Sequence, residues 1–170
     1  MMAVGPEIGR EIASHMATSF KNLFLTDTLN ELTPIDAITV YEEFRELTPD
    51  GDEGNRLVQR LAERLVDADL LGRATALLQH QMDYRLNGQA SADVGQRLAA
   101  IYLLNDEARK ALPVLDKVMA LYSGIEPKDS AITQKIRETE MLRARGLSDE
   151  DKVDEALAIL NRYPPTPDIN

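Results

Sequence analysis

Three short stretches of the sequence carry residue types that could do chemistry, and the first is "DGDEGN", Asp50 to Asn55. Its closely spaced carboxylates and glycines are typical of the start of a calcium-binding loop. That loop requires glycine at its sixth position and a carboxylate at its twelfth, whereas this chain has Asn55 and Leu61 there. A solvated turn therefore explains the stretch better than a calcium site.

The other two stretches place titratable side chains on one face of a predicted helix. Glu7, Glu11 and His15 are four residues apart and could offer ligands to zinc, although the supporting side chains of a zinc site are missing. His80 and Asp83 are one turn apart, and such an imidazole–carboxylate pair suits general acid–base catalysis in a cleft. A polar, outward helix face explains both groups with fewer requirements. We expect no catalytic residues, no bound metal and no cofactor.

The composition limits the classes of partner and the compartment. The 170 residues are 44% hydrophobic and carry a formal net charge of -10, so phosphate backbones would be repelled and nucleic-acid binding is not expected. The longest apolar run, Ala99 to Leu104, is far below the roughly 20 residues needed to span a membrane. The sequence has no cysteine and no pattern of a signal peptide. We therefore expect a cytoplasmic protein without membrane insertion.

Apolar residues recur at helical spacing almost throughout, which predicts an all-α protein. Thr33 followed by Pro34 is typical of a helix N-terminus. We also expect Ser91 and Ser148 to cap helices, and Gly146 to end one. The first helix carries an apolar stripe at every fourth residue, namely Ile8, Ile12, Met16, Phe20 and Phe24. The predicted helices cover about 7–25, 33–47, 55–67, 71–86, 91–104, 107–122, 129–145 and 149–163.

Eight helices joined by short turns predict four antiparallel hairpins, at about 7–47, 55–86, 92–122 and 129–163. They would form one domain, 1–163, followed by a short tail, 164–170. A shift of 37 residues superimposes similar residues of the first three hairpins. The aligned rows are Phe20, Leu57 and Val94; Phe24, Leu61 and Leu98; Ala37, Ala74 and Ala111; Val40, Leu77 and Val114; and Tyr41, Leu78 and Leu115. Leu142, Ala156 and Leu160 follow the same order with one inserted residue. Small residues at a crossing let two helices approach closely, so the rows favour a repeat over coincidence among alanine- and leucine-rich helices.

The third predicted hairpin contains the stretch "RLAAIYLLNDEARKALPVLDKVMAL", from Arg97 to Leu121, which resembles a tetratricopeptide repeat (TPR). The positions that carry the resemblance are Leu98, Ala99, Tyr102, Ala111 and Leu115. The tryptophan position of that family falls on Gly95 and its terminal proline position on Ser123. The spacing of 37 also exceeds the family's usual value of about 34. The stretch from Phe44 to Leu78 is similar to segments of large, uncharacterised bacterial proteins built of TPR-like helices.

The resemblance implies an α-solenoid of about four antiparallel hairpins, a TPR-like superhelix that serves as a non-catalytic protein–protein interaction scaffold. A peptide or helix of a partner protein would bind in a concave groove lined by the first helices. The groove positions implied in this way are Arg56, Gln59, Glu63, Gln96 and Leu103. The alternatives are a homo-oligomeric structural or accessory subunit, or a metal-dependent enzyme with a site near His80 and Asp83.

The last predicted helix favours the oligomeric alternative, because its apolar residues surround most of its circumference and no helix follows it. Those residues are Val153, Ala156, Leu157, Ala158, Ile159 and Leu160. A two-fold contact between two copies of this helix would cover them, so we expect a homodimer through it. Whether the chain is one part of a longer repeat array stays open.

Overall fold

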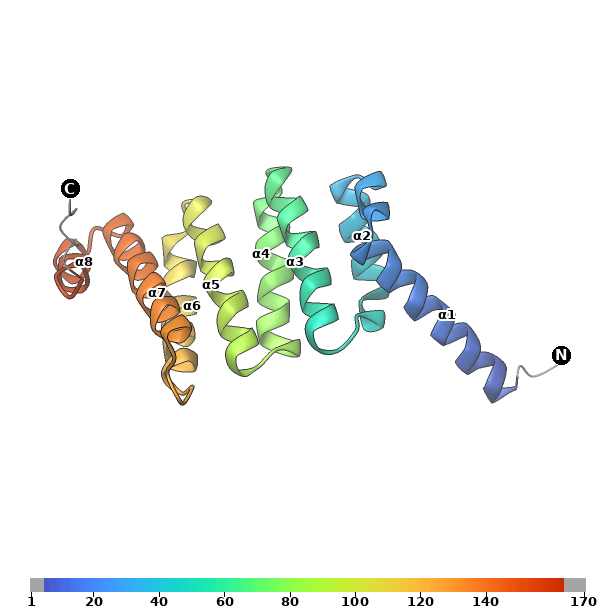
Figure 1. Ribbon diagram of the computed structural model, residues 1–170. Coiled ribbons are helices and arrows are strands. Elements are labelled where there is room, and N and C mark those ends of the chain that lie inside the picture. Colours follow the sequence, from blue (N-terminus) through green and yellow to red (C-terminus); the bar gives the residue numbers. More distant parts are fainter. Residues whose placement is uncertain (1–4, 164–170) are drawn as a thin grey trace, which may run out of the picture. The chain divides into compact units, whose positions relative to one another are not determined.

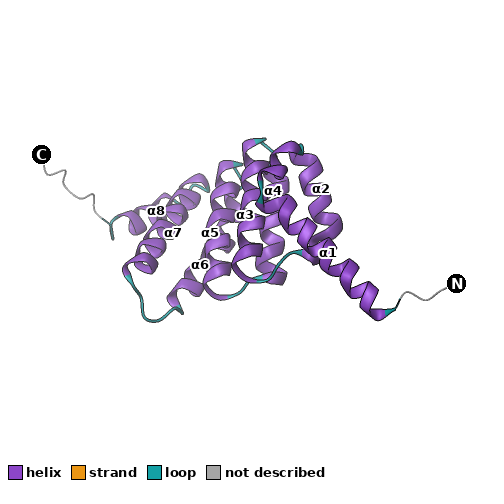
Figure 2. Ribbon diagram, turned by 45° about the vertical axis from the view of Figure 1, so that its right-hand side comes forward, coloured by secondary structure: helices purple, strands orange, loops and turns teal. Residues whose placement is uncertain are grey.

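The computed structural model describes residues 5–163, of which 83% are helical, with no strand among them (Figures 1 and 2). The predicted all-α class is confirmed. The α-helices are α1 Pro6–Leu25, α2 Pro34–Phe44, α3 Gly51–Asp67, α4 Leu71–His80, α5 Gly88–Leu104, α6 Ala108–Ser123, α7 Ser130–Asp149 and α8 Val153–Leu160. Two 3-10 helices, η1 Asp27–Glu31 and η2 Arg45–Leu47, and the π-helical turn η3 Gln81–Arg85 complete the secondary structure. The contacts divide the chain into two compact units, Met1–Leu70 and Leu71–Asn170.

No helix in the described range has both the length and the apolar character needed to cross a membrane.

In the first unit, the C-terminal half of α1 packs against α2 and α3. The rings of Phe20 and Phe24 lie 4.8 Å apart, and Phe24 meets Tyr41 of α2 edge-on at 6.1 Å. The α3 side chain of Arg60 donates a hydrogen bond of 2.8 Å to the carbonyl oxygen of Leu25, which the end of α1 leaves without a helical partner. Thr33 accepts a bond of 3.1 Å from the backbone N–H of Asp36, so the predicted N-cap of α2 is confirmed.

The N-terminal half of α1 extends away from the body of this unit (Figures 1 and 2). All side chains from residue 6 to residue 16 are exposed. The predicted apolar stripe is therefore divided: Phe20 and Phe24 are buried, whereas Ile8, Ile12 and Met16 are exposed by 54%, 52% and 44%.

In the second unit, consecutive helices pack against one another from α4 to α8. Two glycines lie where an added Cβ would meet a neighbouring side chain at 3.0 Å or less. A Cβ added to Gly95 of α5 would lie 2.6 Å from Val118 Cγ2 and 2.7 Å from Met82 Cε. A Cβ on Gly146 would lie 3.0 Å from Leu112 Cδ2. The prediction that Gly146 ends a helix is wrong, because this glycine makes room for α6 while α7 continues to Asp149.

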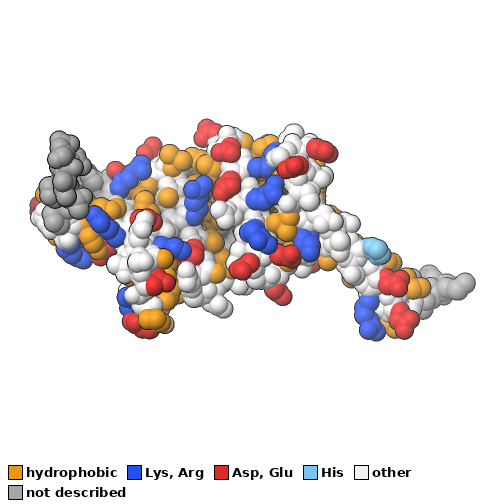
Figure 3. All heavy atoms as spheres, viewed as in Figure 1, with side chains coloured by type: hydrophobic (Ala, Val, Ile, Leu, Met, Phe, Trp, Pro, Cys, Tyr) orange, Lys and Arg blue, Asp and Glu red, His pale blue; other side chains and the backbone are white. Residues whose placement is uncertain are grey.

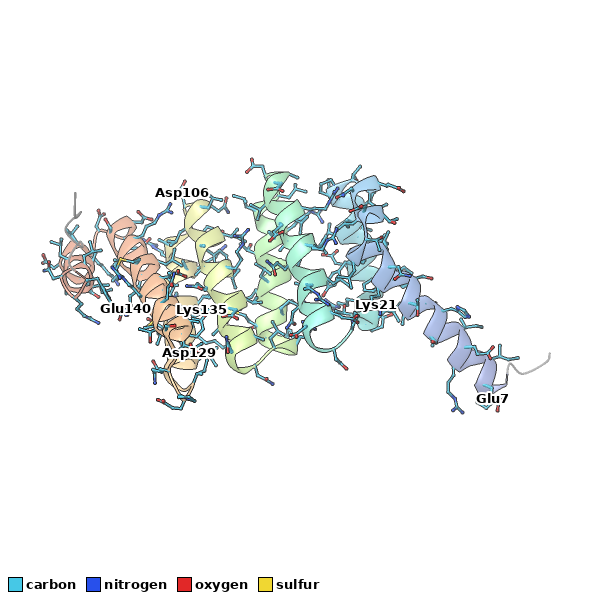
Figure 4. All side chains as sticks on the ribbon, viewed as in Figure 1. Glu7, Lys21, Asp106, Asp129, Lys135 and Glu140 are labelled. Carbon is cyan, nitrogen blue, oxygen red and sulfur yellow. The ribbon has the colours of Figure 1, made fainter. Side chains whose placement is uncertain are left out.

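The end of the described chain is attached to α7. Arg162 donates a hydrogen bond of 3.2 Å to the buried carboxylate of Glu140, which Figure 4 labels. A hydrogen bond to Glu140 raises the pKa of Tyr163, and the guanidinium of Arg137 lies 5.4 Å from the Tyr163 ring centre. The predicted tail, 164–170, lies outside the described residues.

One turn geometry occurs at the ends of α3, α5 and α7. Asp69, Asp106 and Asp151 have φ values of 58°, 57° and 59°, in the left-handed region. In each turn the next backbone N–H donates a bond of 2.8 Å to the carbonyl oxygen five residues before it. The three bonds run from Leu70 to Leu65, from Glu107 to Tyr102 and from Lys152 to Leu147. This is the Schellman arrangement, which satisfies carbonyl groups at a helix end.

The structure corrects three predicted helix boundaries. Ser148 does not cap the last helix, because α7 runs past it and α8 begins only after the Asp151 turn. Ser91 is buried inside α5, which begins at Gly88. The turn predicted at Asp50 to Asn55 is also wrong, because α3 begins at Gly51 and only Asp50 precedes the helix.

We expect replacement of Asp106 by Gly to raise the free energy of unfolding by about 0.5 to 1 kcal/mol, because glycine adopts a positive φ without steric cost. Asp106→Ala should lower it by a similar amount, since alanine keeps the Cβ and lacks the short polar side chain that tolerates this conformation. Urea denaturation of both variants measures the difference. Equal stabilities for the two variants would contradict the left-handed turn.

Three of the five rows aligned in the 37-residue register, those that contain Leu98, Ala111 and Leu115, are buried throughout. The other two rows contain the half-buried residues Val94 and Val40. The fourth predicted hairpin departs from this register. Leu160 is exposed and Ile159 is buried instead, because Ala156 and Ile159 of α8 pack against Ala144 and Leu147 of α7.

Candidate binding groove

The helices α5 and α7 form the walls of an open groove of about 600 Å³ in the second unit. Ala100, Met141 and Leu142 provide its apolar floor, and polar side chains surround this floor. The full lining consists of Asp93, Gln96, Arg97, Ala100, Glu138, Met141 and Leu142. Figure 3 shows hydrophobic side chains on this face, with basic and acidic groups at their edges.

Polar bonds fix the distance between the two walls. Gln96 of α5 donates its amide to the carbonyl oxygen of Lys135 and to Thr139 Oγ1 of α7, both at 3.3 Å. Lys135, labelled in Figure 4, donates a bond of 2.6 Å to Asp93 Oδ1. Thr139 is fully buried, so its bond to Gln96 is shielded from water, whereas the Lys135–Asp93 pair stays partly exposed. Together these bonds link the two walls of the groove.

Asp93 is paired with the cation Lys135 of α7, and its side chain remains partly exposed. Its Oδ1 accepts the bond from Lys135 and a second bond of 2.6 Å from the hydroxyl of Tyr122 on α6. Burial of Tyr122 and its bond to the Asp93 carboxylate together raise the pKa of this phenol far above its ordinary range.

This network predicts a specific dependence of stability on pH. The phenol of Tyr122 ionises near pH 10 in the unfolded chain and at higher pH in the folded chain, so its contribution is complete below about pH 10 and is lost as the pH rises further. We expect the urea midpoint of the wild type to fall above this pH, and to fall less steeply in Tyr122→Phe. Tyr84→Phe, at a site that is 80% exposed, should keep the wild-type slope. Parallel slopes for all three proteins would contradict the network.

The charges that remain available in the groove have opposite signs on its two walls. Arg97 of α5 is exposed and has no ion-pair partner within residues 5–163. Glu138 of α7 is also exposed and accepts a 2.9 Å hydrogen bond from the neutral amide of Gln134. A ligand that lies along the apolar floor would therefore meet a cation on one side and an anion on the other.

The groove positions implied by the sequence fall in different places. Arg56, Gln59 and Glu63 are exposed on α3 in the first unit, where Gln59 donates a bond of 3.1 Å to Glu63. Gln96 lines the groove between α5 and α7. Leu103 is a core residue and not a groove residue, because it is 1% exposed and lies close to Gly146 of α7.

The sequence contains a signal that would have found the α5 wall. A shift of Arg56, Gln59 and Glu63 by 37 residues leads to the lining residues Asp93, Gln96 and Ala100. The α7 wall has a corresponding signal at the longer step of 45 residues, which separates Ala111 from Ala156. This shift leads from the lining residues Asp93, Gln96 and Arg97 of α5 to Glu138, Met141 and Leu142 of α7.

The candidate chemical groups do not assemble into a metal site within residues 5–163, where no three His, Cys, Asp or Glu side chains come together. His80 lies against Tyr84, with ring centres 4.9 Å apart, and the exposed Asp83 accepts a 3.1 Å bond from Gln79. Glu7, Glu11 and His15 are all exposed on the projecting half of α1.

The groove between α5 and α7 is therefore the best candidate for a functional site. No family model matches this chain, and neither does any curated protein or solved structure.

Proposed function

We propose that this chain is a non-catalytic protein-interaction module whose α5–α7 groove binds a helix or peptide of a partner protein. The open groove with an apolar floor and oppositely charged walls carries this proposal. An amphipathic helix can place its apolar face on Ala100, Met141 and Leu142, as in other helix-in-groove complexes. Arg97 and Glu138 would then select the charges at its edges.

A TPR-like α-solenoid is the arrangement that we propose for the helices. The three identical turns and the three buried rows support it, because both recur at the same positions of successive repeats. In such arrays the first helices of the repeats line the concave face. The helices α5 and α7 are the first helices of the third and fourth predicted hairpins. A cytoplasmic location suits a chain without cysteine.

The proposal is tested by selecting binders from a display library of random helical peptides. We expect the selected peptides to carry apolar residues at helical spacing and to lose at least about tenfold in affinity for Ala100→Arg, which fills the groove. The matched control is Ala76→Arg, the same change at an exposed site of α4. Equal binding to the wild type and to Ala100→Arg would contradict the proposal, provided that circular dichroism shows both variants folded.

The second candidate is a homo-oligomeric structural subunit that associates through α8. The observation that favours it is the exposed stripe of Val153, Leu157 and Leu160, which are exposed by 52%, 49% and 44%. Leu157→Glu should shift a dimer toward monomer in light scattering without a loss of helix content. Ile159→Glu does not test this contact, because Ile159 is buried against α7 and its replacement would unfold the helix pair. An unchanged dimer in Leu157→Glu would exclude α8 as the interface.

A further inference from the structure

The dipeptide Asn87-Gly88, at the start of α5, joins two groups that can react with each other (Figure 1). The backbone nitrogen of a residue can attack the side-chain amide of a preceding asparagine. Glycine permits this attack best, because it has no Cβ to hinder the approach. The chain has seven asparagines, and Asn87 alone is followed by glycine. The sequence therefore singles out this position.

The structure leaves both reacting groups accessible. Asn87 and Gly88 are exposed, and the Asn87 side chain forms no hydrogen bond with α5 or with any other part of residues 5–163. The Gly88 N–H is among the first four of the helix, which have no acceptor inside it, and it donates to no other group in the described chain. An added Cβ at Gly88 would meet nothing within 4 Å, so a ring between the two residues has room.

The backbone of this link can rotate into the reactive arrangement. Asn87 has a φ of -144° and a ψ of 173°, and rotation about its Cα–C bond carries the Gly88 nitrogen toward the side-chain carbon Cγ. The hydrogen bond that opposes this rotation is long, because the Ser91 N–H lies 3.4 Å from the Asn87 carbonyl oxygen. Gly88, at a φ of 57°, can absorb the change, since glycine adopts both signs of φ. Opening of the first turn of α5 is therefore sufficient for the reaction.

The preceding repeat shows that an aspartate fits this position. Asp50 and Gly51 lie 37 residues before Asn87 and Gly88. Asp50 is the extended N-cap of α3 without a side-chain cap bond, and Gly51 follows it with a φ of 69°. Asn87 and Gly88 have the same arrangement at the start of α5. A carboxylate there lies at the positive end of the helix dipole, which stabilises it.

We propose that Asn87 is a site of spontaneous deamidation in the folded protein. The Gly88 nitrogen loses its proton and bonds to Asn87 Cγ, the Cγ–Nδ2 bond breaks, and the amide nitrogen leaves with the proton as ammonia. Water then adds to one of the two carbonyl groups of the succinimide ring and opens it. One opening gives aspartate, and the other gives isoaspartate, in which the main chain runs through the side-chain carbon.

The two products act differently on α5. Aspartate keeps the backbone, adds a negative charge and reproduces the residue that begins α3. Isoaspartate adds the same charge but lengthens the main chain by one carbon atom directly before Gly88. The first turn of α5 then has to shift, so this product should be less stable than the aspartyl form.

Incubation of the 170-residue chain in mildly alkaline buffer, followed by digestion and mass spectrometry, tests the proposal. We expect Asn87 to deamidate at least about tenfold faster than Asn105, which corresponds to about 1.4 kcal/mol of activation free energy. Asn105 is the internal control, because it is also exposed but precedes Asp106 and donates a bond of 3.0 Å to Glu107. Aspartyl and isoaspartyl peptides should both form, and Asn87→Gln should abolish the acidic shift in isoelectric focusing.

A second comparison separates the folded site from the dipeptide itself. The chain unfolded in urea gives the reactivity of Asn87 without structure, and we expect the rate in the folded chain to lie within about tenfold of it. Asn87→Asp should keep the helix content and the urea midpoint of the wild type. A folded chain in which Asn87 stays intact while the unfolded chain reacts would overturn the proposal, and so would equal rates at Asn87 and Asn105. A lower midpoint for Asn87→Asp would contradict the match to Asp50.

Discussion

Replacement of Leu98 by Asp should lower the free energy of unfolding by about 4 kcal/mol, because it places an unpaired charge in a fully buried site. Leu98 lies on α5, whose most extensive contact is with α6, and it belongs to the same row as Phe24 and Leu61. Urea denaturation followed by circular dichroism measures the loss. A variant that does not fold at all would also agree with the prediction, because the loss would then exceed the free energy of unfolding of the wild type.

The matched control is Arg97→Asp, one residue away on the exposed side of the same helix. It introduces the same side chain into the same helix, and we expect it to stay within about 0.5 kcal/mol of the wild type. Equal losses at the two positions would show that the buried rows are assigned to the wrong face of α5.

Gly95→Ala should destabilise the chain by about 2 kcal/mol, although the same change in an ordinary helix interior stabilises it by about 1 kcal/mol. The added Cβ would lie 2.6 Å from Val118 Cγ2, and this β-branched side chain has little freedom to move aside. Thermal or urea denaturation gives the sign. Gly72→Ala is the control, because nothing lies within 4 Å of its added Cβ, and it should be neutral or slightly stabilising.

A double-mutant cycle isolates the contact itself. Val118→Ala removes the methyl group that Gly95→Ala would meet. The loss in the double variant should therefore be smaller than the sum of the two single losses, with a coupling of about 1 kcal/mol. If the two losses were additive, the Gly95–Val118 contact would not be the cause of the destabilisation.

The helices could be predicted from the sequence because apolar periodicity reports directly which face of a helix is buried. Their ends were harder to predict. Asp151 forms a left-handed turn that glycine usually forms, so the sequence shows no breaker at the true end of α7. Gly146, which does resemble a breaker, instead makes a close helix contact. A sequence does not distinguish a glycine needed for its φ from one needed for its size.

The candidate site was only partly predictable for a related reason. The repeat register leads from Gln59 to Gln96 by a shift of 37 residues. The same shift leads from Arg56 to Asp93 and from Glu63 to Ala100, and all three end points line the groove. In a helical projection, Leu103 lies on the same face of α5 as Gln96 and Ala100. The close approach of α7 at Gly146 covers it, and packing between helices far apart in sequence is not encoded in periodicity alone.

The position of a bound peptide tests the central claim most directly. Amide chemical shifts of the 170-residue chain would be recorded during titration with a peptide selected from the display library of random helical peptides. We expect the largest changes in α5 and α7, around Arg97, Ala100 and Glu138, and no comparable changes for Ala100→Arg. Changes concentrated on α8, or on the Gln59 and Glu63 face of α3, would contradict a binding groove between α5 and α7.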